Sequence, residues 1–195
     1  MVNYPNGMKK NYSNPIRQPK HDTRHRGYSL EKDLNDSNEY YLAFDKAVIH
    51  KKPTPIQIVK VDYPSRNAAK IVEAYFKIPS TTDYNGIYRG KYIDFEAKEL
   101  NKLNFPFQNI HPHQIEHLSR VIDHGGIAFI VMSFTKLNEV YLLEASYMIE
   151  KYYLSKRKSL SYDEIKGNGY LIPSGYRPRL DYLKVVDEVF FKEEN

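Results

Sequence analysis

The feature that most constrains the fold is residues 127–134 (IAFIVMSF), a segment that is apolar at every position except Ser133. Side chains of a β-strand alternate between the two faces of its sheet, so a strand is apolar throughout only where both faces are covered. With eight residues, the segment is also far too short to cross a bilayer, which takes roughly 20. It therefore predicts a central strand buried between layers.

Further elements are predicted on both sides of this strand. Residues 92–98 fit a second central strand, residues 140–143 a partner strand, and residues 44–50 a short strand. Helical patterns begin at Leu30 behind the capping residue Ser29 and at Pro112, and cover residues 145–154, 162–166 and 179–191. Strands with flanking helices predict an α/β or α+β fold.

An extended hairpin is predicted at about residues 55–78. Two β-prone segments, residues 55–61 and 69–78, are joined by the turn signal YPSRN. An ordinary sheet hairpin with a charged rim is the alternative to a DNA-binding element. The basic residues that become candidate DNA contacts under the second interpretation are Lys60, Arg66 and Lys70.

The net charge of +5 is concentrated in residues 1–26. That segment carries six basic residues against one acidic residue, while the rest of the chain holds 23 of each. Its polar composition predicts a disordered arm ahead of a single folded domain over residues 27–195. The arm either follows DNA phosphates or is a solvated tail. Candidate phosphate contacts, with a charged loop rim as the alternative, are Arg26, Lys51 and Lys52.

Cysteine is absent from the chain, which excludes disulfides, thiolate zinc sites and cysteine nucleophiles. No apolar run approaches the length of a membrane span, and the N-terminal residues contain no apolar signal-peptide core. We therefore expect a soluble protein of the cytoplasm that has no membrane partner.

The residues that carry chemistry are Asp83 and, thirteen positions later, the segment Glu96-Ala97-Lys98. Alternation along a strand places Glu96 and Lys98 on one face and Ala97 on the other. Turn signals at residues 85–86 and 89–90 allow a hairpin that returns Asp83 to the neighbourhood of Glu96. A simple surface ion pair between Glu96 and Lys98 remains the alternative.

Two carboxylates from different strands suit Mg²⁺, a hard cation that prefers oxygen ligands together with water and phosphate oxygens. The metal would polarise a phosphate and lower the pKa of a bound water. Lys98 could orient or deprotonate that water, or neutralise the charge that grows on the phosphate. The predicted products of such a cut carry a 5′-phosphate and a 3′-hydroxyl.

The sequence around these residues resembles the RecU family of Holliday junction resolvases. The similarity rests on STTDYNG, YIDFEAKE and HPHQIEHL, with further matches in RGYSLEKDLNDSNEYYL, IHKKPTPIQIV and PRLDYLKVVD. It covers the chain from about Arg26 to the last predicted helix. One departure is Thr82, which stands where the wider PD-(D/E)xK nuclease fold often has proline.

The resemblance implies the restriction-endonuclease-like fold, a mixed central sheet flanked by helices, with residues 55–78 as a protruding stalk that enters the junction centre. It implies that Thr81, Asp83, Glu96 and Gln114 are metal-site residues and that Lys98 stabilises the transition state. Mg²⁺ is the expected cofactor, with Mn²⁺ a candidate substitute. The expected partners are four-way junction DNA, a second copy of the chain in a homodimer, and a strand-exchange recombinase.

Other interpretations of the sequence remain open. His113 and His117 are spaced i, i+4 near His111, which resembles half of a zinc site, although neither HExxH nor cysteine accompanies them. A non-catalytic DNA-binding protein that modulates recombination would use the same basic arm and hairpin. A sequence-specific restriction-type endonuclease would use the same metal site on linear duplex DNA.

Overall fold

The computed structural model describes residues 29–77 and 81–191. Its centre is a six-stranded sheet in the order β1-β4-β5-β7-β8-β10. β5 (Lys91–Leu100) and β7 (Ile127–Phe134) run parallel, whereas every other neighbouring pair in this sheet is antiparallel. The remaining strands of this sheet are β1 (Val48–Lys51), β4 (Tyr84–Tyr88), β8 (Glu139–Glu144) and β10 (Tyr170–Leu171). The predicted mixed sheet is thus confirmed.

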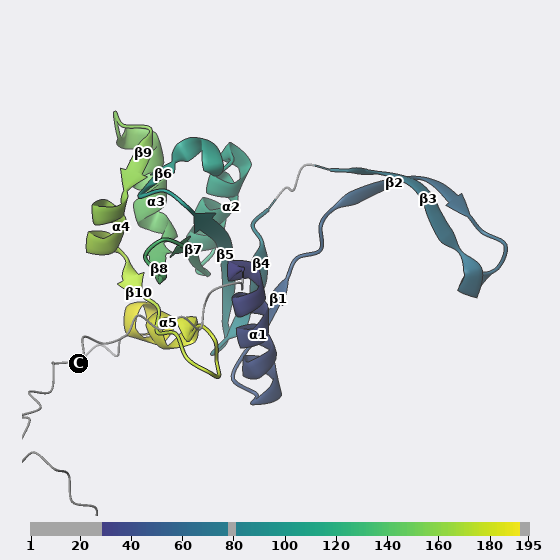
Figure 1. Ribbon diagram of the computed structural model, residues 1–195, viewed down its shortest axis with the longest axis horizontal. Coiled ribbons are helices and arrows are strands. Elements are labelled where there is room, and N and C mark those ends of the chain that lie inside the picture. Colours follow the sequence, from purple (N-terminus) through teal and green to yellow (C-terminus); the bar gives the residue numbers. More distant parts are fainter. Residues whose placement is uncertain (1–28, 78–80, 192–195) are drawn as a thin grey trace, which may run out of the picture.

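Helices cover both faces of this sheet (Figure 1). α1 (Leu30–Ala43) and α5 (Tyr182–Phe190) contribute to the hydrophobic core on one face. The core on the other face takes residues from α2 (Pro112–Asp123), α3 (Ala145–Leu154) and α4 (Tyr162–Asn168). β7 is buried because its side chains supply both cores in alternation, Phe129 to the first and Ile130 to the second. Helices over both faces of β7 are the arrangement that the apolar sequence of this strand predicts.

A two-stranded ribbon, β2 (Ile56–Asp62) paired with β3 (Lys70–Phe76), projects from this body (Figure 1). All residues of both strands are exposed, and the short helix η2 (Arg66–Ala68) forms its tip. At its base, the Lys77 N–H donates to the Pro55 carbonyl at 3.0 Å and the Lys52 N–H to the Asp83 carbonyl at 2.7 Å. The predicted protruding hairpin is confirmed.

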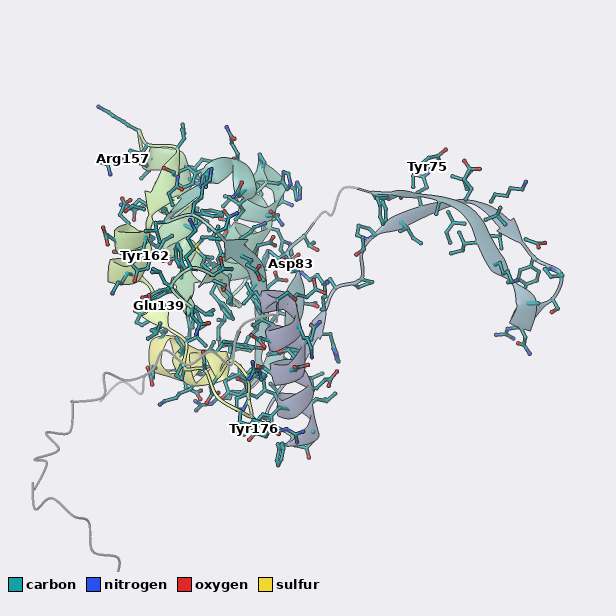
Figure 2. The ribbon with its side chains drawn as sticks, viewed as in Figure 1. Tyr75, Asp83, Glu139, Arg157, Tyr162 and Tyr176 are labelled. Carbon is teal, nitrogen blue, oxygen red and sulfur yellow. The ribbon has the colours of Figure 1, made fainter. Side chains whose placement is uncertain are left out.

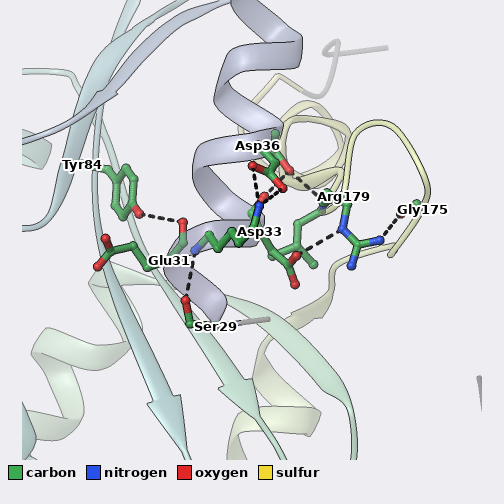
Figure 3. A network of polar contacts seen from close by, with 10 residues as sticks. Ser29, Glu31, Asp33, Asp36, Tyr84, Gly175 and Arg179 are labelled. Atoms are coloured by element: carbon green, nitrogen blue, oxygen red, sulfur yellow. Dashed lines mark hydrogen bonds and ion pairs between the residues drawn. The ribbon is translucent and has the colours of Figure 1, made fainter. Parts of the chain in front are cut away.

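Smaller elements complete the α2 side. β6 (Asn104–Pro106) pairs with β9 (Ser159–Ser161), and η3 (Phe107–Asn109) leads toward α2. On the opposite side, Arg179 contacts Asp33 of α1 at 3.1 Å and so joins the C-terminal part of the chain to the first helix (Figure 3). No helix within residues 29–77 and 81–191 is long and apolar enough to cross a membrane.

Two predicted elements begin later than expected. The strand predicted at residues 44–50 is β1, which begins at Val48, because Phe44 ends α1 and Asp45 adopts a left-handed φ of 52° in the turn that follows. The helix predicted from Arg179 begins at Tyr182, because Leu180 forms a β-bridge with Ser174 and Asp181 has a non-helical ψ of 61°. The predicted arm, residues 1–26, lies outside the described residues.

Candidate metal centre

Asp83 lies immediately before β4, at the base of the hairpin (Figure 2). The pairing of β4 with β5 ends at Tyr84 and Phe95, so the backbone of β5 beyond that point has no β4 partner. The Asp83 carboxylate takes that place, and its Oδ2 accepts a hydrogen bond from the Ala97 N–H at 3.1 Å. The structure therefore brings Asp83 to the backbone between Glu96 and Lys98, as the turn signals predict.

Glu96 and Lys98 lie on the same face of β5, as strand alternation predicts, and their side chains form an ion pair of 2.6 Å between Oε1 and Nζ. This is not the surface pair of the alternative interpretation, because Glu96 is only 1% exposed. Its second oxygen, Oε2, is buried and has no hydrogen-bond partner among the described residues. A buried carboxylate oxygen without a donor is unfavourable on its own, which suits a site that a cation completes.

Burial raises the pKa of Glu96 to about 7. The charge of Lys98 acts in the opposite direction, while the nearby charge of Asp83 raises the pKa further. Gln114 also lowers it through its side chain, which places the amide of α2 beside the same carboxylate. The pKa of Glu96 on β5 therefore depends on Asp83, which precedes β4, and on Gln114 of α2.

Gln114 occupies the first turn of α2 and is buried, and its Oε1 accepts a hydrogen bond from the His111 N–H at 3.0 Å. Thr81 lies next to the hairpin base and lines a cleft of about 590 Å³ together with Asp83. Glu96 and Lys98 do not line that cleft, because they lie on the opposite face of β5 from its lining residues Ala97 and Glu99. Gln114, on α2, does not line it either. Asp83, immediately before β4, lines the cleft, and its charge also acts on Glu96.

The histidines do not form a zinc site. The rings of His111 and His113 stack at 5.3 Å, and His117 instead places its Nε2 3.0 Å from the carboxylate of Asp94. Among the described residues, no group of three or more His, Cys, Asp or Glu side chains is arranged to hold a metal. Two carboxylates with an amide and a hydroxyl nearby form an oxygen set, which suits Mg²⁺ rather than zinc.

Asp94 is a buried residue of this region that the sequence interpretation missed. It lies on β5 two positions before Glu96, is 0% exposed, and is hydrogen-bonded to Lys52, Thr82, Tyr92 and His117. Burial alone would raise the pKa of Asp94, but the bonds from Lys52, Thr82 and His117 outweigh it and lower that pKa. The signal that could have found it is the same alternation that pairs Glu96 with Lys98.

The candidate DNA contacts fall into two groups. Lys51 forms an ion pair with Glu31 on α1, and the Lys52 ammonium contacts Asp94 at 2.8 Å and the Thr82 hydroxyl at 2.9 Å. Lys52 thus has a structural role that the sequence did not reveal. The remaining candidates are exposed on the hairpin, namely Lys60, Arg66 and Lys70, while Arg26 lies outside the described residues.

Comparison with known proteins identifies relatives along almost the whole chain. The family model described as "Recombination protein U" (RecU) matches residues 25–188. Proteins named "Holliday junction resolvase RecU" from Bacillus thuringiensis (strain Al Hakam) and Bacillus cereus (strain AH820) are each 55% identical over 197 residues, which cover 97% of this chain and 98% of the relative. The protein of that name from Bacillus anthracis shows the same identity and coverage.

Among solved structures, the chain matches that of Archaeoglobus fulgidus Hjc, described as a Holliday junction resolvase from an archaeal hyperthermophile. The TM-score is 0.42 and the identity 8%, and the match covers 71% of this chain and 94% of the archaeal one.

Proposed function

The chain belongs to the RecU family, and from that membership we propose that it is a magnesium-dependent endonuclease that resolves Holliday junctions by paired, symmetric nicks in DNA recombination and repair. The observation that carries the proposal is the meeting of Asp83 with the Glu96–Lys98 segment of β5 at the base of a projecting hairpin. A metal bound at that position would lie close to where the hairpin joins the body.

The proposed ligands of Mg²⁺ are the carboxylates of Asp83 and Glu96, with Thr81 and Gln114 completing the site. These are oxygen donors, the type that this cation prefers, and Oε2 of Glu96 is the buried oxygen without a partner among the described residues. When bound, the metal polarises the scissile phosphate and lowers the pKa of a bound water. Mn²⁺ accepts carboxylate and carbonyl ligands as well, so we expect it to substitute.

Lys98 is proposed to stabilise the transition state. Its ammonium group is held at Oε1 of Glu96 and its side chain is only 20% exposed, so its charge is fixed in a mostly buried position. A fixed positive charge there can neutralise the negative charge that grows on the phosphate, and it can orient the attacking water. Attack by water on the phosphate with departure of the 3′ oxygen leaves a 5′-phosphate and a 3′-hydroxyl.

The hairpin is proposed to enter the centre of the four-way junction, where Lys60, Arg66 and Lys70 would contact phosphates. Arg26 and Lys51 are proposed as further phosphate contacts near the body. A junction is resolved by two cuts related by symmetry, so we propose a homodimer whose two-fold axis relates two active sites. A strand-exchange recombinase is a further proposed partner.

The test is cleavage of a synthetic four-way junction, with each strand labelled in turn, in Mg²⁺ and in EDTA. We expect paired nicks in opposed strands with Mg²⁺ alone, and loss of cleavage in Asp83→Asn. The matched control is Asp36→Asn, which alters a partly exposed α1 carboxylate paired with Lys32 and should cut like wild type.

Three outcomes would contradict the proposal. Junction binding without metal-dependent cutting would favour the non-catalytic modulator of recombination. Cleavage of linear duplex at a fixed sequence would favour the restriction-type enzyme. Cleavage by Asp83→Asn at the wild-type rate would remove the metal site itself from the proposal.

A further inference from the structure

Asp94 accepts hydrogen bonds at both of its carboxylate oxygens. The Lys52 ammonium, the Tyr92 hydroxyl and the His117 ring contact Oδ2 at 2.8, 2.8 and 3.0 Å, and the Thr82 hydroxyl bonds to Oδ1. A fully buried carboxylate is stable only when it is paired and hydrogen-bonded, and Asp94 meets both conditions. Asp94 and its hydrogen-bond donors form a polar cluster that has no role in the proposed mechanism.

The donors come from each of the segments that meet at the metal site. Lys52 follows β1, where the chain leaves the body to form the hairpin, and Thr82 lies where the chain returns. Thr82 directly precedes Asp83. His117 lies on α2 three residues after Gln114, so the two side chains lie on the same side of that helix.

Asp94 itself lies on β5 two residues before Glu96, so the carboxylates of these two residues lie on the same face of the strand. One carboxylate thus joins the segment that carries Asp83 and the helix that carries Gln114 to the strand that carries Glu96. Asp83 is also held through its own side chain, by the Ala97 N–H, whereas the amide oxygen of Gln114 is bonded to the N-cap residue of its own helix, His111.

We infer that Asp94 is a positioning residue of the metal centre, which holds the Thr82-Asp83 segment and α2 against β5 so that the proposed ligands face one another. The inference rests on the proposed metal site, but it assigns a role to a residue outside the proposed metal ligands and DNA contacts. Hydrogen-bonded groups around metal ligands commonly change metal affinity or activity by about 10- to 100-fold when they are removed.

The first test is Asp94→Asn, which keeps the shape of the side chain and removes its charge. We expect the Kd for Mg²⁺, measured by isothermal titration of the metal-free protein without DNA, to rise about tenfold or more. Junction binding in EDTA should match that of wild type, because the hairpin surface is unaltered. Junction cleavage should be lost at low Mg²⁺ and regained in large part when Mg²⁺ is raised.

The matched control is Asp33→Asn. Asp33 also forms a mostly buried ion pair, with Arg179, and the side-chain exposures of 10% and 18% resemble the 0% and 18% of Asp94 and Lys52 (Figure 3). It joins α1 to the C-terminal part of the chain rather than to the metal site. We expect both Asp94→Asn and Asp33→Asn to lower Tm, but only Asp94→Asn to raise the Kd for Mg²⁺.

Milder variants keep the inference testable if Asp94→Asn does not fold. His117→Gln removes the donor on α2, whereas Tyr92→Phe removes a donor that comes from the same strand as Asp94. We expect His117→Gln to weaken Mg²⁺ binding and Tyr92→Phe to bind Mg²⁺ like wild type. Equal effects of the two variants, or an unchanged Kd in Asp94→Asn, would overturn the inference. Failure of wild type itself to bind Mg²⁺ or to cut junctions would instead overturn the proposed function.

Discussion

At the scale of single residues, the metal centre depends on one buried carboxylate that is kept partly unsatisfied. Glu96 has Lys98 at one oxygen and no hydrogen-bond partner among the described residues at the other. Such a group makes the metal-free protein less stable than it could be, and the binding of a cation relieves the penalty. Burial of Glu96 thus lowers the folding stability of the metal-free protein at the position where the proposed chemistry takes place.

The first prediction concerns the pH dependence of the metal-free protein. Because the fold raises the pKa of Glu96 to about 7, the folded state holds a proton that the unfolded state releases near its ordinary pKa of 4.5. The contribution of this group is fully present below the unfolded value and is lost as the pH rises to about 7. The glutamine of Glu96→Gln cannot ionise. The free energy of unfolding of this variant relative to wild type should therefore increase between pH 4.5 and 7, by on the order of 2–3 kcal/mol, and its Tm should increase relative to wild type over the same range.

The measurement is thermal unfolding in EDTA at pH values from 4.5 to 8. Glu116→Gln, which alters an exposed carboxylate on α2, is the control and should show no such trend. A difference between Glu96→Gln and wild type that stays constant, or shrinks, as the pH rises would contradict the prediction.

The second prediction concerns Lys98. In Lys98→Met the fixed positive charge is lost, so we expect the single-turnover rate of junction cleavage to fall by about 10²-fold or more. Junction binding, measured by gel shift in Ca²⁺, should stay at the wild-type level because Lys98 is mostly buried. A parallel loss of binding and cleavage would show that Lys98 holds the DNA rather than the transition state.

At the scale of elements, the body and the hairpin differ in what holds them together. In the body, Phe95 of β5 stacks on Tyr84 of β4 at 4.8 Å and on Phe129 of β7 at 4.7 Å, so aromatic rings run across three central strands. In the hairpin, apolar side chains such as Phe76, which is 84% exposed, contribute no core. Substitutions in the two elements should therefore affect different properties.

The third prediction separates these two kinds of element. Phe129→Ala removes a fully buried ring and should destabilise the protein by about 3–5 kcal/mol. Phe76→Ala, the matched control, should change the free energy of unfolding very little. Urea denaturation followed by circular dichroism measures both values, and similar losses in the two variants would contradict the prediction.

The fourth prediction concerns the basic residues of the hairpin. Replacing Lys60, Arg66 and Lys70 together by alanine should weaken junction binding and leave Tm unchanged, because these side chains are exposed. Each phosphate contact that is lost should reduce the slope of log K against log salt concentration by about 1. Binding that is weaker but has the wild-type salt slope would show that these residues do not contact phosphates.

The pattern of the sequence predicts elements and faces well, because both depend on neighbouring residues. Strand alternation predicted that Glu96 and Lys98 share a face, and the ion pair confirms it. Alternation places Asp94 on the face of Glu96 and Lys98, but its contacts were missed because its partner Lys52 lies 42 positions away, and alternation predicts a face rather than a distant partner. The start of β1 was predicted too early for a related reason, since the left-handed turn at Asp45 is not visible in the β-prone composition of residues 44–50.

At the scale of the whole molecule, the proposed reaction requires two cuts, whereas the meeting of Asp83 with the Glu96–Lys98 segment gives each chain one proposed metal centre. The resemblance to RecU therefore bears on assembly as well as on chemistry. A symmetric pair of chains would bring two centres and two hairpins to one junction.

The fifth prediction uses mixed dimers of wild-type chains and Asp83→Asn chains carrying a distinct tag. We expect a purified mixed dimer to nick one strand of a junction and leave the opposed strand intact. Analytical ultracentrifugation should show dimers of unchanged mass for wild type and for the mixture. Paired nicks by the mixed dimer would mean that one centre serves both strands, and a monomeric wild type would rule out the symmetric arrangement.

The way the ribbon is attached also bears on how such a chain can change over evolutionary time. β1 and β4 are direct antiparallel neighbours whose last pair is Lys51 with Tyr84, so the whole projection is an insertion into what would otherwise be a tight turn. Lengthening such an insertion costs little, since each doubling of a flexible loop adds only about 0.6 kcal/mol. The projection can therefore diverge or be exchanged between relatives while the body keeps its topology, provided that Lys52 and the Thr81–Asp83 segment are retained.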